Sequence, residues 1–436
     1  MKKILSILLA VLFILVVFTG CTQNTSGTPS DEGDKVKKTE SDKGTEGDEE
    51  PAKPVELTLY QLQPGIVDQI QEICDMYKQE NPNVTIKSDR PGDDYFNIIK
   101  TMFASGQGPD IFSLNPWTMV EDYATAGLIV DLSNEAFVGR LTDAAKPGVT
   151  IDGKIYALPM EIAGLGITYN RSIFEKYNLK PPKTISELES VCKTLKDNGI
   201  TPFAFSLKET WELRHLFSMG HTPTVDIVKF KEDMNAGQTS FNNEKMDEVF
   251  RAFDVIKANG PENPFDYDYN MQCALMGEGK AAMFATGLWC VDMIRKIDPE
   301  FNPGIFALPI SENPDDAKLS IDVNSVYCIN SKSDAVDKCK KFFDWLSSEE
   351  IASVYAQKTN TIPAVKNVKL WEGADEAFND VVNYANSGNS CPWGFSIWPT
   401  GLDDEIGTAL QQYYTNEISK DQLFETIDSK WADFKQ

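Results

Sequence analysis

Residues 277–289, with the sequence GEGKAAMFATGLW, set the local architecture of the middle of the chain. The glycines at the start of this stretch predict the end of a helix, because glycine adopts the left-handed backbone that closes many helices. Residues 280–285 predict a short buried strand, and Gly287 predicts the turn after it. Trp289 then lies between this strand and the next helix. A large aromatic ring at such a turn offers a ligand a flat apolar surface.

Strand and helix signals alternate before this stretch. An apolar run at 55–62 is followed by a Gln-Pro-Gly turn and by apolar residues at helical spacing as far as Tyr77. A second strand signal at 84–86, a helical stretch at 95–105 and a third strand signal at 111–114 follow. Because strands and helices in this order are typical of parallel sheets with right-handed crossovers, the sequence predicts an α/β fold.

The N-terminus carries the pattern of an export signal. Two lysines precede an apolar run at residues 4–18, which is shorter than the roughly 20 residues that a membrane-spanning helix needs. Small residues stand directly before Cys21, and this arrangement resembles a bacterial lipobox. We therefore expect a lipoprotein signal peptide at 1–20 and lipidation of Cys21. Ordinary secretion and retention as an uncleaved anchor are the alternatives.

A polar segment separates Cys21 from the first strand signal. Residues 22–53 are mainly Thr, Ser, Gly, Pro, Asp, Glu and Lys, and Val36 is their only large apolar residue. Such a segment cannot bury enough apolar surface to offset the entropy lost on ordering. Residues 21–55 are therefore predicted to be a lipidated cysteine and a disordered tether. The tether would hold the protein at the cell membrane, facing the extracellular side or the periplasm.

Size and charge limit the remaining possibilities. The roughly 380 residues after the tether exceed the size at which one hydrophobic core keeps growing, so two lobes are expected. A net charge of −25 argues against nucleic acid as a partner.

Cysteine and histidine usage argues against metal or catalytic chemistry. The chain has eight cysteines, and those other than Cys21 are odd in number and show no zinc-type spacing, so we expect buried or unpaired thiols. Only two histidines are present, and the sequence contains no Walker loop and no G-x-S-x-G motif. We expect no cofactor, no metal and no enzymatic activity.

Three segments together resemble one protein family. They are ASGQGPDIF at 104–112, GKIYALP at 153–159 continuing to LGITYNR at 165–171, and the stretch at 277–289 followed by ALP at 307–309. In this order and spacing they resemble the extracellular solute-binding proteins of sugar ABC importers, the family that includes maltose-binding protein. The resemblance covers nearly all of residues 56–436.

The resemblance implies a fold and a function. The fold would be a two-lobed, periplasmic-binding-protein-like (type II) α/β fold, with strands crossing between the lobes and a ligand cleft. Lobe I would comprise 56–163 plus 325–372, and lobe II would comprise 164–324 plus 373–436. The protein would be a monomer that captures an oligosaccharide and delivers it to the permease subunits of an ABC transporter.

Aromatic residues provide the first candidates for a sugar site, because sugars present apolar ring faces to aromatic platforms. Three tryptophans follow the carboxyl ends of predicted strands, where open α/β sheets bind ligands: Trp117, Trp211 and Trp289. Two more lie in a loop at 387–401 that is rich in Gly, Pro and Ser: Trp393 and Trp398. The resemblance places Trp289 where the family carries a sugar-stacking tryptophan. The alternative for each ring is packing in the core.

Polar candidates would bind the sugar hydroxyls. Glu161, at the crossing from one lobe to the other, is the first choice, and Gln63, after the first strand, is the second. The others lie near strand ends: Gln61, Asn115 and Asp322. A solvated loop carboxylate is the alternative for Glu161. Asp110, before the third strand, is expected only to stabilise its turn.

Two other functions stay open at this point. A binding protein for a different solute, such as a peptide or polyamine, would share the fold. A secreted glycoside hydrolase would also need an aromatic cleft with carboxylates.

Overall fold

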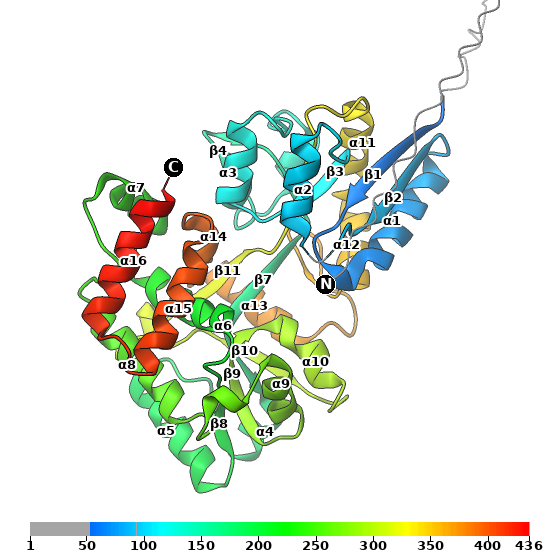
Figure 1. Ribbon diagram of the computed structural model, residues 1–436. Helices are drawn as coiled ribbons and strands as arrows, with labels where there is room; N and C mark the ends of the chain where they lie inside the picture. Colours follow the sequence, from blue (N-terminus) through cyan, green and yellow to red (C-terminus); the bar gives the residue numbers. More distant parts are fainter. Residues whose placement is uncertain (1–52, 93, 436) are drawn as a thin grey trace, which may run out of the picture. The chain divides into compact units, whose positions relative to one another are not determined.

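The computed structural model describes residues 53–92 and 94–435 (Figure 1). The predicted signal peptide, Cys21 and nearly all of the predicted tether lie outside these residues. Within the described ranges, no helix combines the length and the apolar character needed to cross a membrane.

The first part of the chain forms a five-stranded sheet, and we call the body built on it lobe I. Its order is β2-β1-β3-β12-β6. The strands are β1 (Val55–Tyr60), β2 (Val84–Asp89), β3 (Ile111–Leu114), β6 (Leu158–Pro159) and β12 (Val326–Ile329). As predicted, β1 pairs in parallel with β2 and β3, whereas β12 pairs antiparallel with β3. The helices are α1 (Val67–Glu80), α2 (Tyr95–Ala104), α3 (Thr118–Thr125), α11 (Val336–Leu346) and α12 (Glu349–Thr359). A small hairpin joins β4 (Thr150–Ile151) to β5 (Lys154–Ile155).

A seven-stranded sheet organises the rest of the chain, and we call the body built on it lobe II. Its main order is β14-β11-β7-β9-β8, and β10 and β13 also pair with β7 (Figure 1). The strands are β7 (Glu161–Asn170), β8 (Thr201–Ala204), β9 (Ala281–Gly287), β10 (Pro303–Phe306), β11 (Leu319–Val323), β13 (Ile362–Pro363) and β14 (Ser390–Cys391). The strand predicted at 280–285 is therefore present as β9, one residue later at its start and two at its end.

Helices cover the second sheet and extend from it. They are α4 (Arg171–Lys176), α5 (Ile185–Asp197), α6 (Thr210–His221), α7 (Ile227–Ala236), α8 (Met246–Ala258), α9 (Tyr269–Gly277), α10 (Val291–Arg295), α13 (Glu376–Ser387), α14 (Gly394–Ile397), α15 (Leu402–Tyr414) and α16 (Lys420–Phe434). A capping box between Ser419 and Gln422 begins α16. It satisfies backbone N–H groups that would otherwise lack partners.

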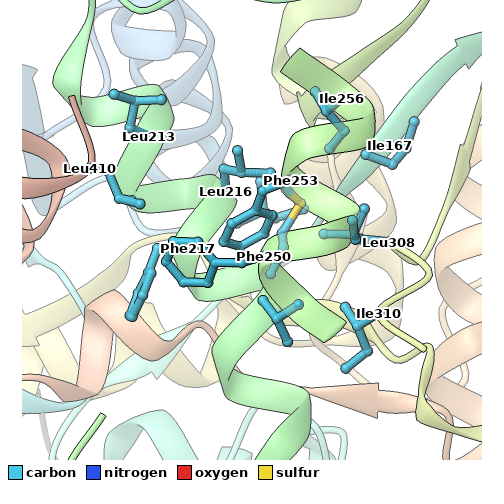
Figure 2. Packing of buried hydrophobic residues seen from close by; sticks show 14 of the residues in the cluster. Ile167, Leu213, Leu216, Phe217, Phe250, Phe253, Ile256, Leu308, Ile310 and Leu410 are labelled. Carbon is cyan, nitrogen blue, oxygen red and sulfur yellow. The ribbon is translucent and has the colours of Figure 1, made fainter. Parts of the chain in front are cut away.

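The core of lobe II fixes the position of α6, which carries two of the site candidates discussed below. Figure 2 shows Leu216 of α6, Phe253 of α8 and Leu410 of α15 packed together. Gly220 allows close contact, because a Cβ at this position would lie 2.5 Å from Cζ of Phe253. A helix packed this closely presents its remaining side chains in fixed directions.

The chain passes between the two sheets at short crossings. β6 ends at Pro159 in the first sheet, and β7 begins at Glu161 in the second. On the way back, β11 ends at Val323 and β12 begins at Val326. Side chains on these crossings therefore lie where both sheets can contribute to one site.

Candidate functional site

Glu161 is buried at the first crossing, with only 1% of its surface exposed. Its Oε1 accepts hydrogen bonds from Gln63 Nε2 at 2.7 Å and from Asn324 Nδ2 at 3.0 Å. Its Oε2 is buried and has no hydrogen-bond partner within the described residues. Burial raises the pKa of this carboxyl, although the bonds to Asn324 and Gln63 and the nearby Thr361 side chain oppose the shift. A buried acceptor without a donor is unfavourable, so this oxygen is suited to a donor supplied from outside the protein.

A cavity of about 340 Å³ adjoins Glu161 and is lined by residues from both lobes. Lobe I contributes Gln63 and residues 358–361, and lobe II contributes Trp289 from the turn after β9. Asn324, on the return crossing, also lines it. The structure thus places three predicted site residues, Gln63, Glu161 and Trp289, on one cavity.

Trp289 belongs to a group of rings that we call the aromatic cluster: Trp211, His215, Trp289, Trp393 and Phe395. Trp289 meets Trp393 edge-on at 6.1 Å and His215 at 5.7 Å. Trp393 stacks on Phe395 at 5.3 Å, and Trp211 meets His215 at 5.3 Å. Trp289 has 36% of its surface exposed, so it combines firm support with an accessible face. Edge-to-face ring pairs of this kind hold each other in orientation.

The two tryptophans of the loop at 387–401 point inward. Trp393 is 4% exposed, and its ring packs edge-on against the ring of Trp289. Trp398 is 1% exposed and packs against Phe217 and Phe241 in the core of lobe II. The predicted open loop is partly replaced by β14 and the one-turn helix α14, which turn Trp398 away from the cavity.

Gln61 is fully buried, and its amide is bonded to the protein. Its Nε2 donates to the Tyr327 hydroxyl at 2.8 Å, and its Oε1 accepts from Ser113 Oγ at 2.7 Å. Asn115 follows β3 and is half-buried, and it does not line the cavity. The structure therefore keeps both side chains away from the Glu161 cavity. The side chain of Asp110 joins the start of β3 to β1, since its Oδ2 accepts from the backbone N–H of Thr58 at 2.9 Å; among the described residues it does not bond within its own turn, contrary to the expectation.

Trp117 and Asp322 contact each other. The indole Nε1 of Trp117 donates to Asp322 Oδ2 at 2.7 Å. Asp322 is 2% exposed, and burial raises its pKa to about 7. Neither residue lines the Glu161 cavity.

Two members of the aromatic cluster had not been predicted. His215 lies four residues after Trp211 on α6, so the two rings share a face, and that spacing could have indicated it. Desolvation, with Arg214 nearby, lowers the pKa of His215 to about 3, so it is a neutral ring at neutral pH. Phe395 lies two residues after Trp393, and no pattern distinguished it from other loop aromatics.

Metal-binding and disulfide chemistry are not evident in this part of the chain. Across residues 53–92 and 94–435, no group of three His, Cys, Asp or Glu side chains is arranged to hold a metal ion. The cysteines in these ranges are all unpaired, and only Cys391 is less than fully buried.

Two α/β lobes with a cavity beside the strands that cross between them define the class of solute-binding proteins. Residues 63–353 match the family described as bacterial extracellular solute-binding protein, and the chain belongs to this family. The family predicted from three sequence segments is therefore confirmed.

Individual relatives agree with this assignment. The multiple sugar-binding protein of Streptococcus mutans is 24% identical, over 80% of this chain and 84% of its own length. The melibiose/raffinose/stachyose-binding protein MelE of Bacillus subtilis is 20% identical, over 85% of this chain and 87% of its own length. The apo form of RafE from Streptococcus pneumoniae aligns with a TM-score of 0.77 and 20% identity, covering 89% of this chain and all of RafE. The likeness to RafE confirms the predicted two-lobed fold.

Proposed function

We propose that this chain is a membrane-anchored, extracellular binding protein that captures an oligosaccharide between its lobes and delivers it to an ABC transporter permease. The observation that carries the proposal is the buried, unpartnered Oε2 of Glu161 on a cavity that also receives the exposed ring of Trp289. A sugar hydroxyl would donate to Oε2, while an apolar sugar face would lie on the indole. The names of the two relatives, which specify sugars, support the same ligand class.

Closure of the lobes would trap the ligand. The proposed bounds are 56–163 plus 325–372 for one lobe and 164–324 plus 373–436 for the other; residues 161–163 of β7 and all of β13 pair in the second sheet and so belong to the crossings between them. The crossings at β7 and between β11 and β12 would act as hinges. Gln63 and Trp289 belong to different lobes, so a ligand that touches both favours the closed arrangement. Their positions on one cavity support this mechanism.

The proposal includes a location. The family is described as extracellular, and lipidation of Cys21 would hold the protein at the outer surface of the membrane. The basis for lipidation is the sequence pattern before Cys21. We also propose that the protein acts as a monomer.

A binding role is favoured over hydrolysis. A glycoside hydrolase places two carboxyl groups on either side of the scissile bond. Two further carboxylates line the cavity, Asp292 and Asp375, and Asp375 is paired with Arg295 Nη1 at 2.9 Å, so it is the family that disfavours hydrolysis. The family and the named relatives are binding proteins, which supports the same conclusion.

A thermal-shift screen tests the proposed function. Raffinose, stachyose, maltotriose, xylotriose and cellotriose would be compared with spermidine and a tripeptide. A ligand that binds only the folded state stabilises it by about 2.7 kcal/mol at 100 times its Kd. We expect at least one oligosaccharide to raise the melting temperature and to be recovered intact after incubation. Stabilisation by spermidine or the peptide alone would establish a different solute, and cleaved sugar would establish a hydrolase.

A further inference from the structure

The carboxylate of Asp322 joins three parts of the fold. Its Oδ2 accepts from Trp117 Nε1 at 2.7 Å and from the backbone N–H of Trp393 at 3.0 Å. Its Oδ1 accepts from the backbone N–H of Val323 at 2.8 Å. One buried side chain at the end of β11 therefore binds the residue preceding α3 in lobe I and the loop before α14 in lobe II.

Trp117 has a backbone conformation that its neighbours must maintain. Its φ is 62° and its ψ is −116°, a region that residues with a Cβ rarely adopt. Its N–H donates to the carbonyl of Gly148 at 2.7 Å. A Cβ on Gly148 would lie 3.2 Å from Trp117 Nε1 and 3.5 Å from Asp322 Oδ1. The absence of a side chain at Gly148 thus leaves room for the hydrogen bond between Trp117 and Asp322.

The bond to Trp393 connects Asp322 to the aromatic cluster. Asp322 holds the backbone of Trp393, whose indole Nε1 donates to the carbonyl of Ser320 at 3.3 Å. With its backbone and indole both bound to β11, Trp393 presents its ring edge-on to Trp289 at 6.1 Å. Of these two rings, that of Trp289 lines the cavity. A shift of Trp393 would therefore change the packing that supports Trp289.

Other contacts join α3 to lobe II, and they differ from the Asp322 contact in kind. Thr118 Oγ1 donates to the carbonyl of Ile397 at 3.0 Å. Glu121 forms a 2.7 Å ion pair with Lys231, and both side chains are partly exposed. Exposed ion pairs contribute little, whereas removing one partner of a buried hydrogen bond leaves the other unsatisfied. The Asp322 carboxylate is therefore the contact whose loss would matter most.

From this geometry we propose that Asp322 is a positioning residue: by binding Trp117 and the backbone of Trp393 together, it sets the orientation of the aromatic cluster and couples that cluster to lobe I. The inference rests on the proposed function, since the cluster is taken to support a ligand. The oxygens of Asp322 are occupied by protein donors, and the residue does not line the cavity. Its effect on a ligand would act through Trp393 and Trp289.

Asp322→Asn and Trp117→Phe test the proposal by changing the acceptor and the donor of the same hydrogen bond. Whichever way the new amide of Asp322→Asn is turned, an NH₂ group faces an N–H donor of Val323 or of the two tryptophans. Trp117→Phe keeps an aromatic ring but removes the indole donor together with part of the ring volume. Lys231→Gln is the matched control, because it breaks the ion pair between α3 and α7 and leaves the buried carboxylate unchanged.

The first measurement is the near-ultraviolet circular dichroism of the unliganded protein, with far-ultraviolet spectra confirming that each variant folds. Trp117→Phe itself removes a tryptophan chromophore and is therefore tested by affinity in the second measurement. We expect Asp322→Asn to change the signal from the tryptophans, and Lys231→Gln to leave it as in the wild type. This result does not depend on any ligand. If the signal in Asp322→Asn matches that of the control, the proposal is overturned. If Asp322→Asn does not fold, the affinity of Trp117→Phe decides, and an affinity equal to that of Lys231→Gln overturns the proposal.

The second measurement is the affinity for raffinose, or for the oligosaccharide that gives the largest shift in the screen. We expect both test variants to lose affinity about fivefold or more. Trp289→Ala should lower affinity less in the Asp322→Asn background than in the wild type, because both changes act through one cluster. Additive losses would overturn the coupling. If the dichroism signal of Asp322→Asn changes but the wild type binds no oligosaccharide, the proposed function is rejected and the positioning role of Asp322 is kept.

Discussion

The side-chain amide of Gln63 donates a 2.7 Å hydrogen bond to Oε1 of Glu161, which joins the end of β1 to the start of β7. The bond places an amide from lobe I against a buried carboxylate at the crossing. Because Oε1 is occupied by Gln63 and Asn324, Oε2 is the buried oxygen that lacks a donor among the described residues, and a ligand hydroxyl would have to reach it as the lobes rearrange.

Glu161→Gln is expected to reduce oligosaccharide affinity by about tenfold or more, because an N–H donor replaces an acceptor at the unpartnered position. The new side-chain oxygen can still accept from Gln63 and Asn324, so the fold should be kept. Isothermal titration calorimetry measures the affinity. Glu248→Gln, an exposed carboxylate on α8, is the control and should bind as the wild type does. Equal affinities in the two variants would remove Glu161 from the site.

Trp289→Ala is expected to lower affinity at least about tenfold, which corresponds to about 1.4 kcal/mol, because a stacked ring face is lost. Its partly exposed position predicts a smaller effect on stability than on binding. Trp345→Ala provides the contrast, since that ring packs against Tyr77 at 5.1 Å in lobe I and should affect stability alone. Calorimetry and thermal unfolding of both variants separate the two effects. Unchanged binding in Trp289→Ala would refute the role of this ring.

Trp398→Ala is expected to destabilise the protein by about 3–5 kcal/mol, because removing a large ring from a packed core leaves a cavity. Denaturant unfolding measures the change. At temperatures where the variant stays folded, its affinity should fall less than that of Trp289→Ala. A variant with nearly wild-type stability and strongly reduced binding would show that Trp398 contributes to ligand binding.

The sequence predicted which segments form helices and strands, and where the chain crosses between the lobes, better than it predicted which way individual side chains point. β3 was predicted at 111–114 and is observed there, because a short apolar run between turn signals has few alternatives. Trp393 and Trp398 could not be separated, since a single turn of helix determines which way each ring faces. The pairing of Trp117 with Asp322 joins residues 205 positions apart, and no local pattern encodes such a contact.

Lipidation of Cys21 leads to a prediction in cells. Cys21→Ala should either release the protein into the surrounding medium or leave it with an uncleaved signal, because no thiol is available for the lipid. Fractionation and intact-mass measurement distinguish these forms. Cys391→Ala, at an unpaired cysteine within the folded part, is the control and should stay at the membrane. Membrane retention of processed Cys21→Ala would contradict the lipid anchor.

The stability of the protein should fall as pH rises from about 6.5 to about 8 because of Glu212. Gln272 Nε2 donates to both oxygens of this carboxyl, at 2.8 and 2.7 Å, yet burial raises its pKa from 4.5 to about 8. Between these values the folded chain holds a proton that the unfolded chain releases. This group alone therefore lowers the free energy of unfolding by about 1.4 kcal/mol per pH unit.

Other buried groups set the window for that measurement. Asp322, with a pKa of about 7, acts in the same direction up to that pH. His215 and His221 have pKa values lowered to about 3 from 6.5, so they act in the opposite direction below pH 6.5 and cease to contribute above it. Denaturant unfolding at pH 6.5, 7.5 and 8.5 should therefore show a declining stability in the wild type and a flatter profile in Glu212→Gln. Glu248→Gln, at an exposed position on α8, is the control and should keep the wild-type slope of stability against pH. If Glu212→Gln also has the wild-type slope, Glu212 is ionised in the folded state throughout this range.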